Sequence, residues 1–402
     1  MVLALIFFGI LISYIDRGNV SIAAPVLMHD FALSTGAMGL LLSAFFWTYG
    51  AFQLPAGSIV DRFGVRQSYF VAFLIWSLAS AGTALSPNTQ TIFGLRLLLG
   101  AAESVGPLAS LAFIRHAFSE RERGFPVATY IAGQTVGPAC GALLGSALLA
   151  AAGWRVMFAV TGLGALLWLP FWLGFAKLGP NRVERASLPV KSPGWTWRAI
   201  LSNGACWAMS GCVFLFSYYW YFLLTWIPTY LSVSRGLPVL TMGRIVAVPL
   251  FIMAPVNIAV GWLADSAISR YGHALKIRIV LAITGFLGAG TILMLPRAPG
   301  RLSVLAILTA SACSFGFASA NFWTIVQYVA PPHLTARVIA CFNTLSQVGG
   351  AVAPVITGYT LGASKNFSVA ITLAGLSTVA ASGLLLVTGT RGVQGMKHLL
   401  ES

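Results

Sequence analysis

The chain has 402 residues, of which 58% are hydrophobic and 8% are charged, and its mean hydropathy is +0.85. Soluble domains carry about 25% charged residues, so this composition excludes an ordinary soluble protein and indicates one that crosses a lipid bilayer many times. A net charge of +15 would favour a nucleic-acid partner in a soluble protein. In a membrane protein the basic residues report topology instead, and we expect no nucleic-acid partner.

The first residues, MVLALIFFGILISY, are as apolar as a secretory signal. No basic segment precedes them, and charges follow before a plausible cleavage site, so we expect them to open the first membrane helix. The five cysteines lie in apolar stretches without paired spacing. We therefore expect neither a disulfide framework nor a metal site.

Apolar runs of about 20 residues, the length that crosses a hydrocarbon core of about 30 Å, recur along the chain. We place spans at 2–27, 37–60, 67–86, 92–114, 124–151, 155–176, 206–232, 242–264, 279–296, 302–329, 335–362 and 367–389. The longest polar segment lies between the sixth and seventh spans. The sequence thus predicts an all-α polytopic membrane protein with twelve transmembrane helices in two pseudo-symmetric six-helix bundles, at 1–177 and 206–390. A cytoplasmic linker at 178–205 joins them, and a cytoplasmic tail at 391–402 follows.

The basic residues are unevenly divided between the two sides of this topology. If both termini lie inside, the outer loops contain Arg155, Arg235, Arg244, Arg297, Arg301 and Lys365. Arg17 and Arg96 fall within spans, and the remaining sixteen of the 24 Lys and Arg lie in inner loops or the tail. The positive-inside rule therefore favours two cytoplasmic termini.

Two inner loops repeat a pattern. GSIVDRFGVR follows the second span and GWLADSAISRYGHALKIR follows the eighth, and Gly57 and Asp61 recur as Gly261 and Asp265, 204 residues later. Parallel repeats of this kind build many secondary transporters, with a central site between the halves. The first loop resembles the G-x-x-x-D-R-F-G-x-R motif of the major facilitator superfamily, which implies that fold.

The motif residues of the first loop are Gly57, Asp61, Arg62, Gly64 and Arg66. We expect the aspartate to cap or pair near a helix end, and the arginines to reach neighbouring carbonyls or lipid phosphates. An ordinary basic inner loop is the alternative. In the second copy a serine follows the aspartate, so weaker contacts are expected there.

Four ionisable residues remain inside the predicted spans and away from their ends, all in the first half. Asp16 and Arg17 lie in SYIDRGN, and Arg96 and Glu103 lie in GLRLLLGAAESVGP. Each costs about 2.5–3.5 kcal/mol to insert. Arg96 and Glu103 are two helical turns apart, about 10.5 Å along one face of a helix, so both side chains can face the same cavity. Asp16 and Arg17 are adjacent, so their side chains point about 100° apart around the helix.

This charge set has two interpretations. Asp16 with Arg96, or Arg17 with Glu103, could be fixed ion pairs that only hold helices together. Alternatively, a carrier needs a fixed cation for an anionic substrate and a carboxylate that takes up a proton. A substrate anion on the guanidinium would then favour protonation of the carboxylate.

The pattern Y-x-D-R-x-N at Tyr14–Asn19, the R-x-x-x-x-x-x-E of the fourth span, Tyr49 in FFWTYGAFQLPAG and the segment FLLTWIPTYL resemble the anion:cation symporter family. That family belongs to the same superfamily and includes bacterial galactonate, glucarate and hexuronate permeases. The resemblance implies that Arg17 binds the substrate carboxylate, that Asp16 and Glu103 are the proton-coupling acids, and that Arg96 modulates Asp16. Whether Asp16 titrates or only pairs with Arg96 stays open.

The resemblance also implies that Tyr14, Tyr49 and Gln134 line the substrate site. Packing of the two tyrosine rings against neighbouring helices is the alternative. Gln134 lies in GQTVGPACGALLG, whose small residues predict a close approach to another helix.

Away from the ends of its predicted spans, the second half has no ionisable residue, so its contribution must come from neutral polar groups or rings. The candidates for substrate binding are Asn321 and Trp323 in ASANFWTIV, and Asn343 and Gln347 in CFNTLSQVGG. Hydrogen bonding between helices is the alternative for each of them.

Taken together, these features predict a proton-coupled symporter that imports a small organic anion, such as a sugar acid or similar monocarboxylate, by alternating access. We expect a monomer in a bacterial inner membrane, with the proton as coupling ion and no cofactor. An exporter or antiporter of drug-like or organic solutes and a transporter-like sensor are the alternatives. The five histidines lie at loops or span ends without triad or metal spacing, so no enzyme is expected.

Overall fold

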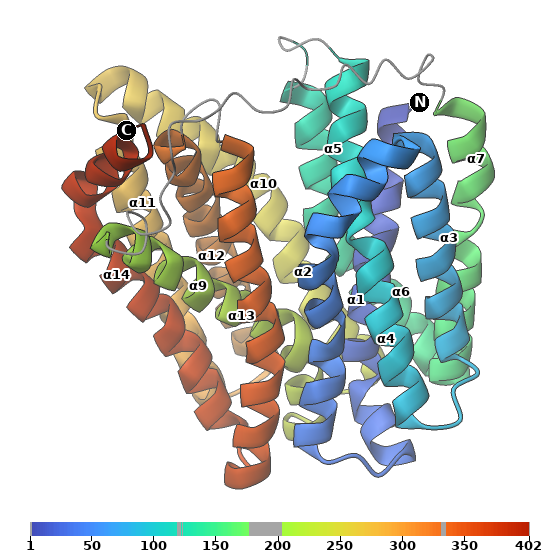
Figure 1. The fold of residues 1–402 in the computed structure, drawn as a ribbon. Coiled ribbons are helices and arrows are strands. Elements are labelled where there is room, and N and C mark those ends of the chain that lie inside the picture. Colours follow the sequence, from blue (N-terminus) through green and yellow to red (C-terminus); the bar gives the residue numbers. More distant parts are fainter. Residues whose placement is uncertain (1, 119–121, 123, 177–202, 331–334, 402) are drawn as a thin grey trace. The chain divides into compact units, whose positions relative to one another are not determined.

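The structure is a computed structural model that describes residues 2–118, 122, 124–176, 203–330 and 335–401. These residues are almost entirely helical, and no strand occurs among them (Figure 1). Helices satisfy their own backbone hydrogen bonds, which is what a chain of apolar segments requires in lipid. The predicted all-α polytopic fold class is confirmed. Of the predicted linker at 178–205, residues 178–202 lie outside the described residues.

The chain forms two compact units, and each is described by itself. The first comprises Met1–Ala186, Leu224–Ala247 and Pro354–Ala363, and the second comprises Ser187–Leu223, Val248–Ala353 and Ser364–Ser402. The predicted boundaries of the two bundles stay a prediction.

The helices that precede residue 177 are α1 (Val2–Asp30), α2 (Thr35–Phe63), α3 (Val65–Thr83), α4 (Thr89–Glu103), α5 (Val105–Ala117), α6 (Gly124–Ala165) and α7 (Trp168–Phe175). Those that follow residue 202 are α9 (Gly204–Thr229), η2 (Tyr230–Ser234), α10 (Val239–Tyr271), α11 (Ala274–Ala289), η3 (Gly290–Arg297), α12 (Arg301–Val329), α13 (Thr335–Ser364) and α14 (Phe367–Glu401). Most bounds lie within a few residues of the predicted spans.

Local chemistry sets several of these boundaries. Ser34 caps α2 by accepting a hydrogen bond from the Ala37 amide, and Asn88 caps α4 by accepting one from Thr91. Gly64 separates α2 from α3 with φ 79° and ψ 156°, a conformation that favours glycine. The sharp reversal in the first inner loop therefore depends on this residue.

Eight of the described helical segments are long and apolar enough to cross a membrane, and α2, bent by 56° near Pro55, makes a ninth. One of the eight, Phe125–Phe175, has 51 residues. At 1.5 Å per residue it is more than twice as long as a hydrocarbon core is thick, and its backbone leaves helical geometry at Gly153. It therefore holds the two spans predicted there. α3 and α13, with 19 and 30 residues, are long enough to account for the remaining predicted spans.

The first unit brings α1, α2, α4 and α6 together. A Cβ atom on Gly133 or Gly137 of α6 would lie 2.3 Å from Ile10 or 2.6 Å from Tyr14 of α1, so these glycines allow the two backbones to approach. The predicted close helix contact is confirmed. Between α2 and α4, the Thr48 hydroxyl donates to the Leu97 carbonyl at 2.6 Å.

An aromatic core packs α3 against α7. Phe73 of α3 stacks on Trp168 of α7 with centroids 4.2 Å apart, and Trp168 stacks on Trp172 at 5.0 Å. Both indole nitrogens are satisfied, because Trp168 donates to the Leu5 carbonyl and Trp172 to the Arg66 carbonyl. This packing holds α1 and α3 in register around the charged residues.

Candidate functional site

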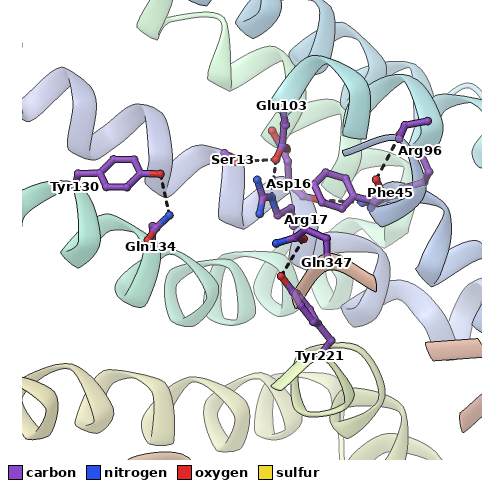
Figure 2. Close-up of polar contacts among 11 residues, drawn as sticks. Ser13, Asp16, Arg17, Phe45, Arg96, Glu103, Tyr130, Gln134, Tyr221 and Gln347 are labelled. Atoms are coloured by element: carbon purple, nitrogen blue, oxygen red, sulfur yellow. Dashed lines mark hydrogen bonds and ion pairs between the residues drawn. The ribbon is translucent and has the colours of Figure 1, made fainter. Parts of the chain in front are cut away.

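The four ionisable residues predicted within the first half lie close together in the first unit. Asp16 and Arg17 are in the middle of α1, Arg96 lies halfway along α4, and Glu103 is the last residue of α4. Asp16, Arg96 and Glu103 are buried, and the Arg17 side chain is 12% exposed. Figure 2 shows the side chains of α1 and α4 pointing toward one another.

Arg17 and Glu103 form an ion pair. The Nε atom of Arg17 donates to Oε2 of Glu103 at 2.6 Å, and the Ser13 hydroxyl donates to the same oxygen at 2.7 Å (Figure 2). Arg17 Nη2 and Glu103 Oε1 are buried without a hydrogen-bond partner among the described residues. The pair therefore leaves both a donor and an acceptor unused where an unmade hydrogen bond is costly.

Asp16 and Arg96 meet in a different way. The Asp16 carboxylate accepts a hydrogen bond from Ser80 of α3 at 2.8 Å, while Arg96 Nη1 donates to the main-chain carbonyl of Asp16 at 3.3 Å. In the described part of the chain, no ion pair joins the two side chains within 4 Å. Of the two ion pairs suggested by the sequence, only that of Arg17 with Glu103 is formed.

Three aromatic rings surround the Arg17 guanidinium. Its Cζ atom lies 4.6 Å from the ring centroid of Tyr14, 4.7 Å from that of Phe45 and 4.5 Å from that of Tyr49. Each distance is within the range of a cation–π interaction. The two predicted tyrosines therefore contact the predicted anion-binding arginine through their rings.

Gln134 lies on α6, whose glycines face α1. Its amide nitrogen donates to the hydroxyl of Tyr130, one helical turn earlier, at 2.9 Å (Figure 2). Tyr130 is 5% exposed. Gln134 and Tyr130 thus form a hydrogen-bonded polar pair within a mostly apolar segment of α6.

The neutral candidates of the second half lie on α12 and α13 in the second unit. Gln347 is buried and accepts a hydrogen bond from the Tyr221 hydroxyl at 3.2 Å (Figure 2). Trp323 is half-buried and packs edge-on against Phe322. Asn343 is half-buried on α13.

Asn321 is engaged in helix packing. Its amide oxygen accepts from Arg278 of α11 at 3.5 Å, and its amide nitrogen donates to the carbonyl of Phe317. Arg278 also pairs with Asp265 at the end of α10, at 2.7 Å. The asparagine thus takes part in the helix–helix hydrogen bonding that the sequence left open as its alternative role.

The motif residues of the first inner loop occupy the α2–α3 junction. Asp61 and Arg62 are exposed on the last turn of α2, and Gly57 lies one turn earlier, with open space where a Cβ atom would lie. Arg66, in the first turn of α3, donates to the carbonyl of Leu173 in α7. Gly64 provides the turn itself.

The second inner loop repeats this junction with a longer helix. Arg270, Tyr271 and Gly272 follow Arg62, Phe63 and Gly64 by 208 residues, and Gly272 has φ 72° as Gly64 has φ 79°. The Gly and Asp pairs are offset by only 204. The extra four residues are about one helical turn, inserted between Asp265 and the turn glycine. Arg278 then lies within reach of Asp265, so the second loop has its own ion pair.

The family model described as Major Facilitator Superfamily matches residues 6–354. The chain belongs to this superfamily. This facilitator is 28% identical to the D-galactonate transporter of Escherichia coli over 96% of its own length and 94% of that protein. It is 27% identical to the hexuronate transporter of Bacillus subtilis over 95% of its own length and 92% of that protein.

A crystal structure of a bacterial homologue of the human lysosomal transporter Spinster, inward-facing and unoccupied, shares the fold. Its TM-score is 0.76 at 17% identity, with 100% of this chain and 97% of that chain covered. The family and the relatives are transporters, so the predictions of a multi-pass membrane protein that is not an enzyme are confirmed. The predicted resemblance to bacterial sugar-acid permeases is confirmed as well.

Sequence reasoning missed four residues of this facilitator's charged cluster and its surroundings. Three of them lie one helical turn before a predicted residue: Ser13 before Arg17, Phe45 before Tyr49 and Tyr130 before Gln134. The helical period could have found these three. Ser80, on α3, has no such signal, because only the packing of α3 on α1 brings it to Asp16.

Proposed function

We propose that this facilitator is a proton-coupled symporter that imports a small organic anion, a sugar acid or similar monocarboxylate, by alternating access. One observation supports this most: a buried Arg17–Glu103 pair in which Arg17 Nη2 and Glu103 Oε1 have no hydrogen-bond partner in the described part of the chain. Such a pair is poorly suited to be only a structural contact, since it leaves buried polar atoms unsatisfied.

The proposed substrate class follows from the guanidinium and from the relatives. Arginine binds carboxylates through paired N–H donors, and only the Nε donor of Arg17 is used by Glu103. The relatives are named for galactonate, hexuronate, and galactarate or glucarate, all of which are carboxylates. Neutral groups such as Gln134, Asn343 and Gln347 suit the hydroxyls of such acids.

Proton coupling is proposed to operate through the shared guanidinium. A substrate carboxylate on the Nη edge of Arg17 would place a second negative charge beside Glu103. Two anions on one cation repel each other, and a proton on Glu103 relieves this repulsion. Substrate and proton then bind together and leave together, which is the requirement for symport.

Asp16 is proposed as the second proton-coupling acid. Its carboxylate is held by the Ser80 hydroxyl alone and keeps Oδ2 without a partner among the described residues. Arg96 binds the Asp16 main chain and so supplies a positive charge near the carboxylate without neutralising it in a direct pair. We propose that Arg96 modulates Asp16 in this way.

We propose that the protein lies in a bacterial cytoplasmic membrane, as its bacterial relatives suggest, and the uneven distribution of Lys and Arg supports an orientation with both termini inside. The protein is proposed to act as a monomer with the proton as coupling ion and no cofactor.

Uptake into proteoliposomes tests the proposal. Labelled D-galactonate, a hexuronate, D-glucarate and sulfoacetate are offered with an inward proton gradient, with no gradient, and with a sodium gradient in its place. At least one acid is expected to accumulate above the external concentration only with the proton gradient, and a protonophore should abolish this. Accumulation of none of the acids, or uptake that ignores the proton gradient, would contradict the proposal.

A further inference from the structure

The environment of Arg17 contains a ring that neither the motif nor the proposed coupling step uses. Phe45 of α2 lies near the Arg17 side chain (Figure 2), and its ring centroid is 4.7 Å from Cζ. The ring centroids of Tyr14 and Tyr49 are at similar distances, 4.6 and 4.5 Å. Phe45 has no hydroxyl, so it can act on the cation only through its ring. We call the three rings the aromatic box.

Phe45 is held rigidly. Its side chain is 2% exposed and stacks on Tyr49 with centroids 5.2 Å apart and planes 26° from parallel. Its main-chain carbonyl faces Gly100 of α4, where any Cβ atom would lie only 2.2 Å from the oxygen. The close contact between α2 and α4 therefore holds Phe45, one ring of the aromatic box, next to the helix that carries Glu103.

The aromatic box holds the cation without using its hydrogen-bond donors. A ring attracts a guanidinium through its face, while the N–H groups of the guanidinium lie in its own plane. Glu103 takes the Nε donor, and Nη2 has no partner among the described residues. Contact with three rings thus replaces water around the cation without taking up the Nη2 donor.

We propose that Phe45 is a positioning residue for the substrate: with Tyr14 and Tyr49 it holds the Arg17 guanidinium through ring–cation contacts, so that Nη2 is kept in place to bind a carboxylate. This inference rests on the proposed function for the identity of the ligand. The aromatic box itself does not, because the ring–cation contacts involve only residues of this chain. The two parts are therefore tested separately.

The first test uses the full-length protein without ligand. Phe45 is replaced by phenylalanines with one, two and three ring fluorines, which weaken the negative ring face stepwise at nearly constant size. The same series is made in a background with Arg17→Met and Glu103→Gln, which lacks the cation and leaves no unpaired charge. The melting temperature is expected to fall with each fluorine in the wild-type background and not in the neutral background.

The second test measures D-galactonate binding. Phe45→Leu, which keeps an apolar side chain but removes the ring face, should weaken affinity about 2- to 30-fold, the range expected for a cation–π contact. Phe45→Trp keeps a ring face and should bind more tightly than Phe45→Leu. Tyr49→Phe and Tyr49→Leu give the matched comparison for a ring with a hydroxyl, and the phenylalanine variant should keep the greater affinity.

The outcomes separate the two proposals. If the melting temperature responds to fluorination equally in both backgrounds, Phe45 only fills space and the inference is overturned. If fluorination acts in the wild-type background alone but D-galactonate does not bind, the aromatic box stands and D-galactonate is excluded as the substrate. If D-galactonate binds and Phe45→Leu retains wild-type affinity, the positioning role is excluded.

Discussion

The two units each contain an arginine–carboxylate pair of almost the same length in very different surroundings. Arg17 and Glu103 are 2.6 Å apart, and their side chains are 12% and 0% exposed. Arg278 and Asp265 are 2.7 Å apart, and their side chains are 21% and 71% exposed. Distance alone does not distinguish a candidate coupling site from a contact at a helix end.

The difference lies in solvation and in unused hydrogen-bonding capacity. An exposed pair contributes about 0–1 kcal/mol because water competes for both charges. Removing one partner of a buried pair costs about 3–5 kcal/mol, since the remaining charge is stranded. The buried pair also has an unpaired donor and acceptor, whereas Arg278 bonds both Asp265 and Asn321. A ligand or proton can therefore change the buried pair strongly and the exposed pair only weakly.

The largest effect is expected from Arg17→Ala. It removes the proposed anion-binding cation, so substrate affinity should fall about 100-fold or more, the loss expected for two charge-assisted hydrogen bonds. Glu103 is left buried without its partner, and stability should fall by about 3–5 kcal/mol. Substrate binding and thermal melting in detergent measure the two effects.

A double variant separates the loss of substrate affinity from the loss of stability. Arg17→Ala combined with Glu103→Gln removes the stranded charge and should recover much of the lost stability while substrate binding stays absent. If binding returned together with stability, Arg17 would be only a structural partner of Glu103.

The next effect is expected from Glu103→Gln alone. The amide keeps the shape of the side chain but cannot exchange a proton, so gradient-driven accumulation should be lost while counterflow of substrate persists. Uptake and counterflow in the same proteoliposomes give both values. Wild-type accumulation would remove Glu103 from the coupling role.

A smaller effect is expected at the loop that both halves repeat. Gly64→Ala forces a side chain into a backbone conformation with φ 79° and ψ 156°, which should cost about 1–3 kcal/mol. Gly57→Ala is the matched control in the same motif, because its Cβ position is open and its backbone is helical. Thermal melting should show a clear loss for the first variant and little change for the second.

The smallest effect is expected from Asp265→Asn. The exposed pair with Arg278 should contribute no more than about 1 kcal/mol to stability, and raised salt should reduce the difference further. A loss as large as that of Arg17→Ala would show that exposure does not explain the contrast between the two pairs.

Much of the fold could be predicted from the sequence because its signals are local. Apolar runs gave helix positions close to those of α1 and α12, and the motif placed Gly64 at a junction between helices. The isolation of Asp16, Arg17, Arg96 and Glu103 in apolar segments marked the candidate site. The π-helical end of α9 and the one-turn extension of α10 were not foreseen, since neither changes the hydropathy pattern.

The sequence by itself determined that the protein is a helical membrane protein and which side chains must find polar partners within it. Hydropathy and helical period suffice for this, because a charge near the middle of an apolar membrane segment is costly whatever residues surround it in the sequence. Only the tertiary structure decided the partners. Arg17 and Glu103 are 86 residues apart, and Ser80 and Asp16 are 64 apart, so their pairing depends on how the helices are rotated against one another. The same packing brought Phe45, an ordinary apolar residue in the sequence, to the face of Arg17.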